Sequence, residues 1–261
     1  MKTEIYYFSG TGNSLYIAKA VNESLIEPGD VFPITKYNEV PTVVINADVL
    51  GFVFPVYMET VPDVVENFIT RIDLRSEPYI FAAITYNSHA HYILPLFNKL
   101  LNGRSMELSL GEVVNMPGNA IVSSPEENEK RLIASQQRIK DIASKVDKKA
   151  VEFLMPPILG KELSSVKERA NAVLPNLRNK FQSTSLCTGC GTCVRVCPMA
   201  NVELKNSLPE WGDHCAICLA CFHWCPNNAI MWTAPVVGDR PQYHHPLVTA
   251  ADIAEQCQPY K

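Results

Sequence analysis

The chain has 261 residues, of which 47% are hydrophobic and 19% are charged, and its formal net charge is −4 at pH 7. This length predicts one or two domains, and the composition excludes disordered, collagen-like and small disulfide-scaffold proteins. The acidic balance offers no basic surplus for phosphates, so we expect neither nucleic acid nor an anionic membrane as a partner. We find no apolar stretch typical of a secretion signal or a membrane span, and we expect a cytoplasmic protein.

Continuous apolar runs in the first part of the chain predict buried strands at residues 4–8, 49–54 and 79–84. Such runs are typical of parallel strands that are covered on both faces, and helical stretches lie between them, so we place these three strands at the centre of a sheet. The run at residues 31–34 contains Pro33. Because proline cannot donate to a strand ladder, this strand belongs at an edge.

A fifth strand is predicted at residues 105–110, where Met106, Leu108 and Leu110 alternate with polar residues. This period of two indicates a half-covered strand at the opposite edge. The five strands then take the order 2-1-3-4-5, which is the flavodoxin-like doubly wound α/β sheet. An amphipathic helix that opens at Pro125 closes a first domain over residues 1–150.

A turn rich in hydroxyl groups, residues 9–14, joins the first strand to a helical pattern. Donors that converge at a helix N-terminus form an anion site. The turn lacks the lysine of a nucleotide-triphosphate loop and the third glycine of the dinucleotide fingerprint. The alternative is an ordinary helix start that Asn13 or Ser14 caps.

This turn resembles the phosphate loop of flavodoxins, and the resemblance covers residues 1–150. It implies FMN bound at the switch point between the first and third strands, with the loops after the third, fourth and fifth strands completing the pocket. Either Tyr57 or Tyr86 fits a stacking role against the flavin, and simple packing is the alternative. His89 and His91 could pass protons there or be solvated loop residues. The predicted FMN-site residues are Ser9, Gly10, Thr11, Gly12, Asn13, Ser14, Pro55, Val56, Tyr57, Thr85, Tyr86, Asn87 and Asn119.

Eight of the nine cysteines lie between residues 187 and 225, and Cys257 stands apart near the end. Because cytoplasmic thiols stay reduced, this clustering points to metal or redox chemistry. The eight form two C-x2-C-x2-C-x3-C-P runs, in which the fourth cysteine ligates the cluster of the other run. We therefore assign one 4Fe-4S cluster to the cluster-one cysteines and another to the cluster-two cysteines, while a pair of structural zinc sites is the alternative. The cluster-one cysteines are Cys187, Cys190, Cys193 and Cys225, and the cluster-two cysteines are Cys215, Cys218, Cys221 and Cys197.

Both runs together resemble the two-cluster bacterial ferredoxins and predict an α+β ferredoxin-like domain over residues 182–234. Residues 151–181 are predicted to be a linker that ends in a helix, and residues 235–261 a tail packed over one domain or between both.

A flavodoxin-like part followed by a two-cluster ferredoxin part resembles the flavodoxin-ferredoxin fusion flavoproteins of anaerobic prokaryotes. The resemblance implies an electron-transfer protein with FMN and two 4Fe-4S clusters, no catalytic side chain, and ferredoxin or a reductase as redox partner. The chain could form a homodimer. One alternative is an FMN-dependent reductase whose flavin edge takes a small substrate and whose clusters feed it electrons. Another is a redox sensor or a subunit of a larger redox complex.

Overall fold

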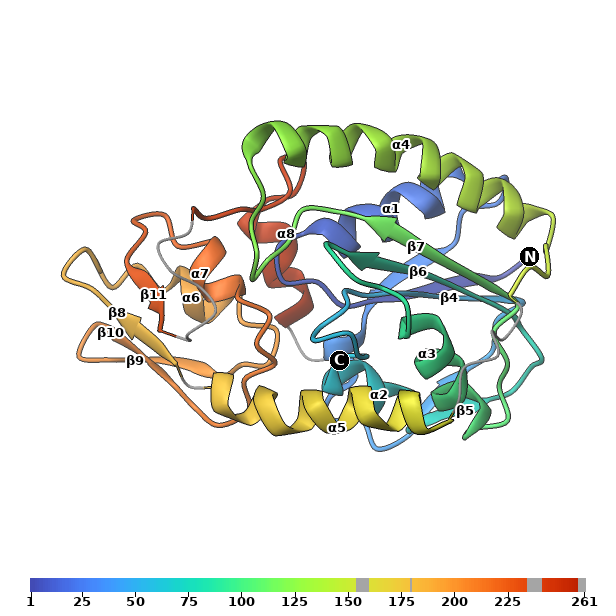
Figure 1. Cartoon of the computed structure of the whole chain (residues 1–261), viewed down its shortest axis with the longest axis horizontal. Helices are drawn as coiled ribbons and strands as arrows, with labels where there is room; N and C mark the ends of the chain where they lie inside the picture. The colour runs from blue at the N-terminus through green and yellow to red at the C-terminus, as the bar shows by residue number, and fades with distance from the viewer. Residues whose placement is uncertain (154–159, 179, 234–240, 258–261) are drawn as a thin grey trace.

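The computed structural model describes residues 1–153, 160–178, 180–233 and 241–257. Its first part is built around one parallel sheet in the order β2-β1-β4-β6-β7 (Figure 1). This order confirms the predicted 2-1-3-4-5 arrangement, and the proline-containing strand lies at an edge as expected. The strands are β1 (Thr3–Tyr7), β2 (Asp30–Pro33), β4 (Val49–Val53), β6 (Tyr79–Tyr86) and β7 (Leu110–Asn115).

Helices cover both faces of this sheet, which explains why its central strands are mostly apolar and buried. The helices α1 (Asn13–Ser24) and α4 (Pro125–Asp147) pack together on one face. On the other face lie α2 (Asp63–Ile69) and α3 (Ile93–Asn102), as Figure 1 shows. Fully buried aromatic side chains fill the core between these layers, among them Phe8, Phe52, Phe54, Phe81 and Phe97.

The predicted position of the fifth strand is wrong, because β7 begins only at Leu110. Residues 105–109 instead form a loop that turns back against α3, where the Leu108 N–H donates to Asn98 Oδ1 at 2.9 Å. The side chains of Met106 and Leu108 are buried and fix this loop to the core, so the apolar and polar residues alternate here as they would in a strand. In β7 itself, the buried Glu112 forms ion pairs with Arg138 and Lys145.

Two short strands and a 3-10 helix between β2 and β6 were not predicted. Strands β3 (Val43–Ile45) and β5 (Ile72–Leu74) pair in parallel, and η1 (Ile34–Tyr37) follows β2 directly.

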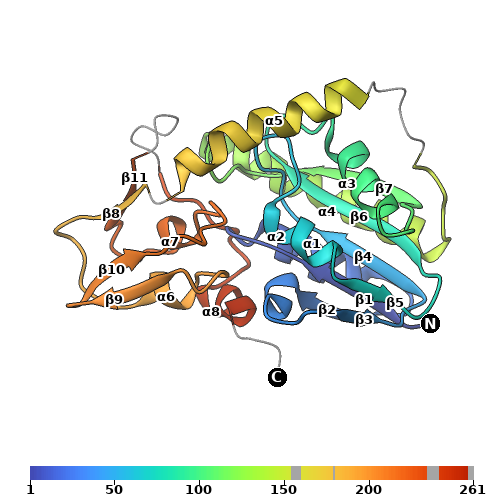
Figure 2. The same cartoon turned by 90° about the horizontal axis from the view of Figure 1, so that it is seen from below.

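The second part of the chain consists of small sheets and one-turn helices. Helix α5 (Gly160–Leu177) runs along the α2 side of the first part and leads into the second part (Figures 1 and 2). Two antiparallel pairs follow, β8 (Phe181–Ser183) with β11 (Ile230–Trp232) and β9 (Val202–Lys205) with β10 (Leu208–Trp211). The short helices α6 (Thr192–Arg195) and α7 (Ala220–His223) each lie within one cysteine run. This is the predicted α+β arrangement.

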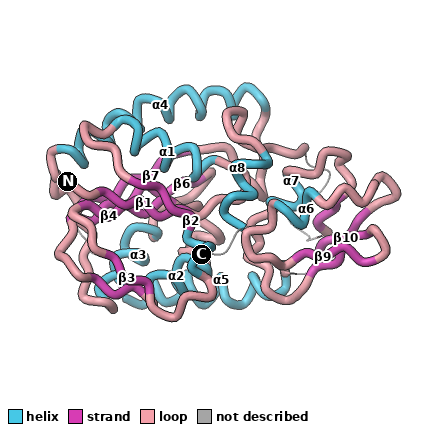
Figure 3. Tube along the Cα trace, turned by 180° about the vertical axis from the view of Figure 1, so that it is seen from behind, coloured by secondary structure: helices cyan, strands magenta, loops and turns pink. Residues whose placement is uncertain are grey.

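The last described segment, residues 241–257, returns to the junction of the two parts. It ends in α8 (Ala250–Ala254) and η2 (Glu255–Cys257), and α8 lies between the two parts in Figures 1 and 3. Two predicted segments lie partly outside the described residues. These are the linker, at residues 154–159 and 179, and the tail, at residues 235–240 and 258–261. Within the described ranges, no helix has the length and apolar character to cross a membrane.

Candidate functional site

Residues 9–14, the phosphate loop, form the turn between the end of β1 and the start of α1. Ser9, Thr11, Asn13 and Ser14 are all buried there. Gly12 is the N-terminal cap residue of α1, with a left-handed φ of 92°, and no side chain caps the helix. Neither side chain proposed in the ordinary-cap alternative therefore caps this helix.

The phosphate loop is bonded to two of the other predicted loops. Ser14 Oγ and Thr85 Oγ1 lie 2.8 Å apart in a hydrogen bond. Asn13 Nδ2 donates to the Pro117 carbonyl at 2.8 Å. These contacts hold the carboxyl ends of β1, β6 and β7 together, where the fold places ligands.

A small cavity of about 50 Å³, the loop cavity, lies inside this arrangement. All the predicted FMN-site residues except Gly12 line it. A second cavity of about 210 Å³, the flavin cavity, shares Val56, Tyr57, Asn87, Gly118 and Asn119 with the first. It continues toward α5 and the cysteine-rich part, where its lining is apolar and includes Leu174, Leu177, Ile217 and Trp232.

Tyr57 stands where the two cavities meet. Its hydroxyl is buried and has no hydrogen-bond partner among the residues that the structure describes. Burial first, and then the thiols of Cys218 and Cys215, raise the pKa of this phenol well above its usual value. Tyr86 is half-buried and lines only the loop cavity. Of the two candidate tyrosines, Tyr57 is therefore the one that lines both cavities.

The residues fit FMN by their chemistry. The loop cavity carries neutral hydroxyl and amide groups at a helix N-terminus, which suit a phosphate. The flavin cavity carries apolar walls and one unpartnered hydroxyl, which suit a flat ring with polar edges.

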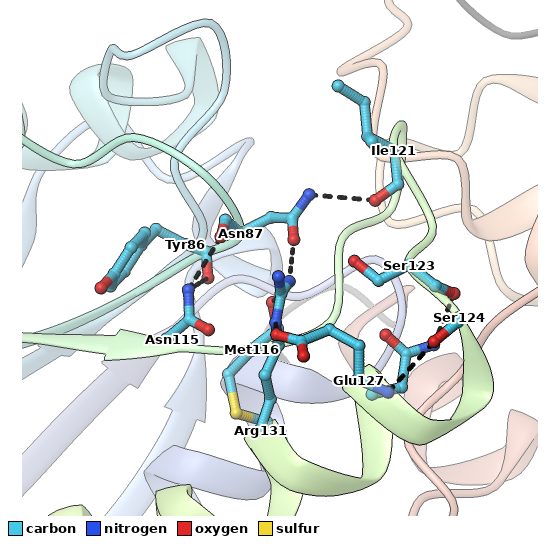
Figure 4. A network of polar contacts seen from close by, with 10 residues as sticks. Tyr86, Asn87, Asn115, Met116, Ile121, Ser123, Ser124, Glu127 and Arg131 are labelled. Carbon is cyan, nitrogen blue, oxygen red and sulfur yellow. Dashed lines mark hydrogen bonds and ion pairs between the residues drawn. The ribbon is translucent and has the colours of Figure 1, made fainter.

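A polar network fixes the rim of both cavities (Figure 4). Asn87 Nδ2 donates to the Ile121 carbonyl at 3.0 Å, and Asn115 Nδ2 donates to the Asn87 carbonyl at 2.8 Å. Arg131 donates to Asn87 Oδ1 and pairs with Glu127 at 3.0 Å. The side chain of Asn87 is thus occupied by the protein framework. Sequence reasoning missed Arg131, because nothing in the helix pattern distinguishes it from a solvated surface cation.

The two candidate histidines lie at the outer edge of the flavin cavity. His89 lines it, whereas His91 does not. Both are exposed, and their rings are 6.1 Å apart. The structure thus brings only His89 to the cavity.

The four cluster-one cysteines line a single small cavity in the second part of the chain. Gly189 and Gly191 also line it, with left-handed φ values of 69° and 72° that only glycine adopts without strain. Cys225 Sγ accepts a hydrogen bond from the Ala229 N–H at 3.3 Å. Amide donors of this kind stabilise the negative charge of ligated sulfur.

The cluster-two cysteines are also mutual neighbours. Burial raises the pKa of the Cys218 thiol well above its usual value, and the thiols of Cys197, Cys215 and Cys221 raise it further. Backbone N–H groups donate to Cys197 Sγ and Cys215 Sγ at 3.3 Å. In the described ranges no three ligand-type side chains converge closely enough to hold a single ion, so the grouping rests on these neighbours. The ninth cysteine, Cys257, lies outside both groups in η2.

The phosphate loop and the cluster-two cysteines are in direct contact. A methyl group on Gly10 would lie 2.2 Å from the carbonyl oxygen of Cys218. Trp224 Nε1 donates to the Gly10 carbonyl at 2.9 Å, and Asn119 Nδ2 donates to the Cys218 carbonyl at 3.4 Å. Sequence reasoning predicted both sites but gave no sign that they touch.

Three residues that contact the phosphate loop carried no motif. Tyr243 Oη donates to Asn13 Oδ1 at 2.7 Å, Gln256 bonds to Ser9, and the His245 N–H donates to the Thr11 carbonyl at 2.8 Å. Each lies more than 220 residues from its partner along the chain, so no local pattern indicates the contact.

In a comparison with known proteins, each of the two parts of the chain matches a different family model. Residues 4–113 match the family model described as Flavodoxin domain, and residues 186–230 match the one described as 4Fe-4S dicluster domain. Among solved structures, a putative flavoprotein from Bacteroides uniformis is similar at 16% identity and a TM-score of 0.38, covering 55% of this chain and 98% of its own. The two-electron reduced flavodoxin of Megasphaera elsdenii is similar at 15% identity and a TM-score of 0.37, with 54% and 98% covered. An azoreductase from Bacillus anthracis is similar at 13% identity and a TM-score of 0.40, with 56% and 100% covered. No curated protein matches the chain.

Proposed function

We propose that this chain, an electron-transfer flavoprotein that joins a flavodoxin domain to a 4Fe-4S dicluster domain, passes electrons between FMN and two 4Fe-4S clusters. The observation that carries the proposal is the contact between Gly10 of the phosphate loop and Cys218 of the cluster-two cysteines. Two cofactor sites that share a wall suit electron exchange within one chain.

In this proposal the hydroxyl groups of Ser9, Thr11 and Ser14 hold the FMN phosphate. Tyr57 and the apolar walls of the flavin cavity hold the ring and exclude water from it. When bound, FMN supplies one- and two-electron chemistry and each cluster supplies one-electron chemistry. The chain's own part is to position these groups and to set their electrostatic surroundings.

The cysteine groups differ in their distance from the flavin site. Cys218 of the second group is buried against the phosphate loop, and Cys215 lies near Tyr57. Cys190 of the first group is exposed. We therefore assign the cluster-two cysteines to the centre beside the flavin and the cluster-one cysteines to the centre nearest a redox partner. Ferredoxin or a reductase in the cytoplasm is the partner we propose, and a homodimer remains a prediction.

A reductase of a small substrate is the second candidate, and one observation favours it. A polar cavity of about 540 Å³ shares Tyr57, Leu174 and Ile217 with the flavin cavity. Arg178 and His214 also line it. A small polar substrate could enter there, next to the flavin site.

The test is cofactor content followed by turnover. Anaerobically purified protein is expected to hold one FMN and about eight irons per chain. Four irons, or zinc, would contradict the two-cluster assignment. Reversible one-electron exchange with a ferredoxin, without consumption of a small acceptor, supports the carrier, whereas steady turnover of a small acceptor without a partner protein supports the reductase.

A further inference from the structure

The C-terminal half of the chain binds three successive carbonyl groups of the phosphate loop. The Ser9 carbonyl accepts from Gln256 Nε2 at 2.7 Å, and the Gly10 carbonyl accepts from Trp224 Nε1 at 2.9 Å. The Thr11 carbonyl accepts from the His245 N–H at 2.8 Å. All three donors lie outside residues 4–113, which match the flavodoxin model.

These hydrogen bonds fix the direction of the loop's N–H groups. In a planar trans peptide the C=O and the following N–H point in opposite directions. When the carbonyls of residues 9–11 are held toward the C-terminal half, the N–H groups of Gly10, Thr11 and Gly12 point to the other side of the loop. The Gly12 N–H donates to Ser9 Oγ at 3.1 Å, within the loop itself.

The other two N–H groups are left without an acceptor. Neither Gly10 N–H nor Thr11 N–H donates to any group in the part of the chain that the structure describes, although both residues are buried. Buried backbone donors are almost always paired. Two unpaired N–H groups that face one way at a helix N-terminus form a concave anion site.

The donors are themselves held rigidly. Gln256 is buried, its Oε1 accepts from the Ser9 N–H at 3.4 Å, and its carbonyl accepts from Thr35 Oγ1 at 2.5 Å. The Trp224 ring stacks on His244 with centroids 4.2 Å apart. Loss of the Trp224 donor therefore frees one loop carbonyl, and loss of the Gln256 side chain frees the carbonyl and the N–H of Ser9, while the other contacts of the C-terminal segment remain.

We propose that Gln256, Trp224 and His245 are positioning residues that turn the phosphate loop into its phosphate-binding form. The phosphate site then belongs to the whole chain, because the carbonyl groups of residues 9–11 are held by donors that lie outside the flavodoxin part. This inference rests on the proposed FMN site and names the FMN phosphate as the group that the oriented N–H donors bind.

The test compares FMN with riboflavin, which has the same ring and no phosphate. The variants are Gln256→Met and Trp224→Phe in the full chain with its clusters, freed of flavin and titrated anaerobically by flavin fluorescence. One net hydrogen bond is worth roughly fivefold in affinity. Trp224→Phe removes one hydrogen bond and is expected to raise the Kd for FMN about fivefold. Gln256→Met removes two, one of them long at 3.4 Å, and is expected to raise it at least fivefold, so that the double variant loses at least about 25-fold if the two add. The Kd for riboflavin is expected to stay at the wild-type value.

Gln242→Met is the matched control. Gln242 lies in the same segment and donates to the carbonyls of Phe222 and Cys225 at 2.6 and 3.0 Å, but it does not bond to the phosphate loop. Its variant is expected to bind both flavins as the wild type does. Parallel losses of FMN and riboflavin affinity, or no loss of either in Gln256→Met and Trp224→Phe, would overturn the inference. A wild-type chain that binds riboflavin but not FMN, or neither, would instead overturn the proposed function.

Discussion

Replacement of Gly10 by alanine tests the contact between the two cofactor sites. The added Cβ would lie 2.2 Å from the Cys218 carbonyl oxygen and 3.1 Å from the Cys218 carbonyl carbon and Cβ. Ordinary contact begins near 3.4 Å, so the phosphate loop and the Cys218 backbone must separate by about 1.2 Å. A change of side-chain rotamer cannot relieve the overlap, because the nearest atoms belong to the backbone.

Overpacking of this kind costs about 1–3 kcal/mol. If the phosphate loop moves to relieve the overlap, the cost weakens FMN binding, and at 3 kcal/mol the Kd for FMN would rise about 150-fold. The assay is an anaerobic FMN titration of Gly10→Ala, with the EPR spectrum of the reduced clusters recorded in parallel. We expect weaker FMN binding together with an altered spectrum of the cluster held by Cys218.

Gly160→Ala is the matched control, since among the described residues no atom outside its own helix backbone and chain neighbours lies within 4 Å of the added methyl group. It is expected to leave FMN affinity and the cluster spectra unchanged. Wild-type FMN affinity and wild-type spectra in Gly10→Ala would refute the claim that the two sites share this wall.

Two further predictions concern the cysteine groups and acidity. Cys197→Ser is expected to damage the cluster held with Cys218, and Cys225→Ser the other one; EPR spectra that show the reverse would contradict the assignment. Burial lowers the pKa of His245 to about 4 from its ordinary value of 6.5, so the unfolded chain binds more protons between these values and stability falls as the pH drops through this window. From pH 7.5 to 5.5 this histidine should account for about 1.3 kcal/mol of lost stability. Chemical denaturation at both pH values is expected to show that His245→Phe loses about 1.3 kcal/mol less unfolding free energy than the wild type between pH 7.5 and 5.5. An equal pH dependence in both proteins would contradict the lowered pKa of His245.

The sheet could be predicted because its signal is local. Strands β1, β4 and β6 are apolar runs between amphipathic helices, and this pattern alone gives their central position. The fifth strand was predicted at the correct edge but with the wrong bounds, because the buried Glu112 of β7 depends on Arg138 and Lys145 of α4, far along the chain. The apolar pair Met106 and Leu108 gave the stronger local pattern and belongs to a loop.

The candidate sites could be predicted only as separate units. The spacing of the cysteines and the hydroxyl-rich turn each have a recognisable motif. The contacts that join them do not, because Trp224 bonds to Gly10 and Gln256 bonds to Ser9 across more than 200 residues of sequence. Long-range contacts of this kind follow from the packing of the whole chain, which no local window of sequence contains.

In the proposed function, electrons move between the flavin and the clusters of one chain. This transfer can be tested by a fast one-electron pulse reduction of the anaerobic holoprotein, followed at flavin and cluster wavelengths. We expect the electron to redistribute between the two kinds of centre in a first-order step whose rate does not depend on protein concentration. No redistribution, or a rate proportional to protein concentration, would contradict it.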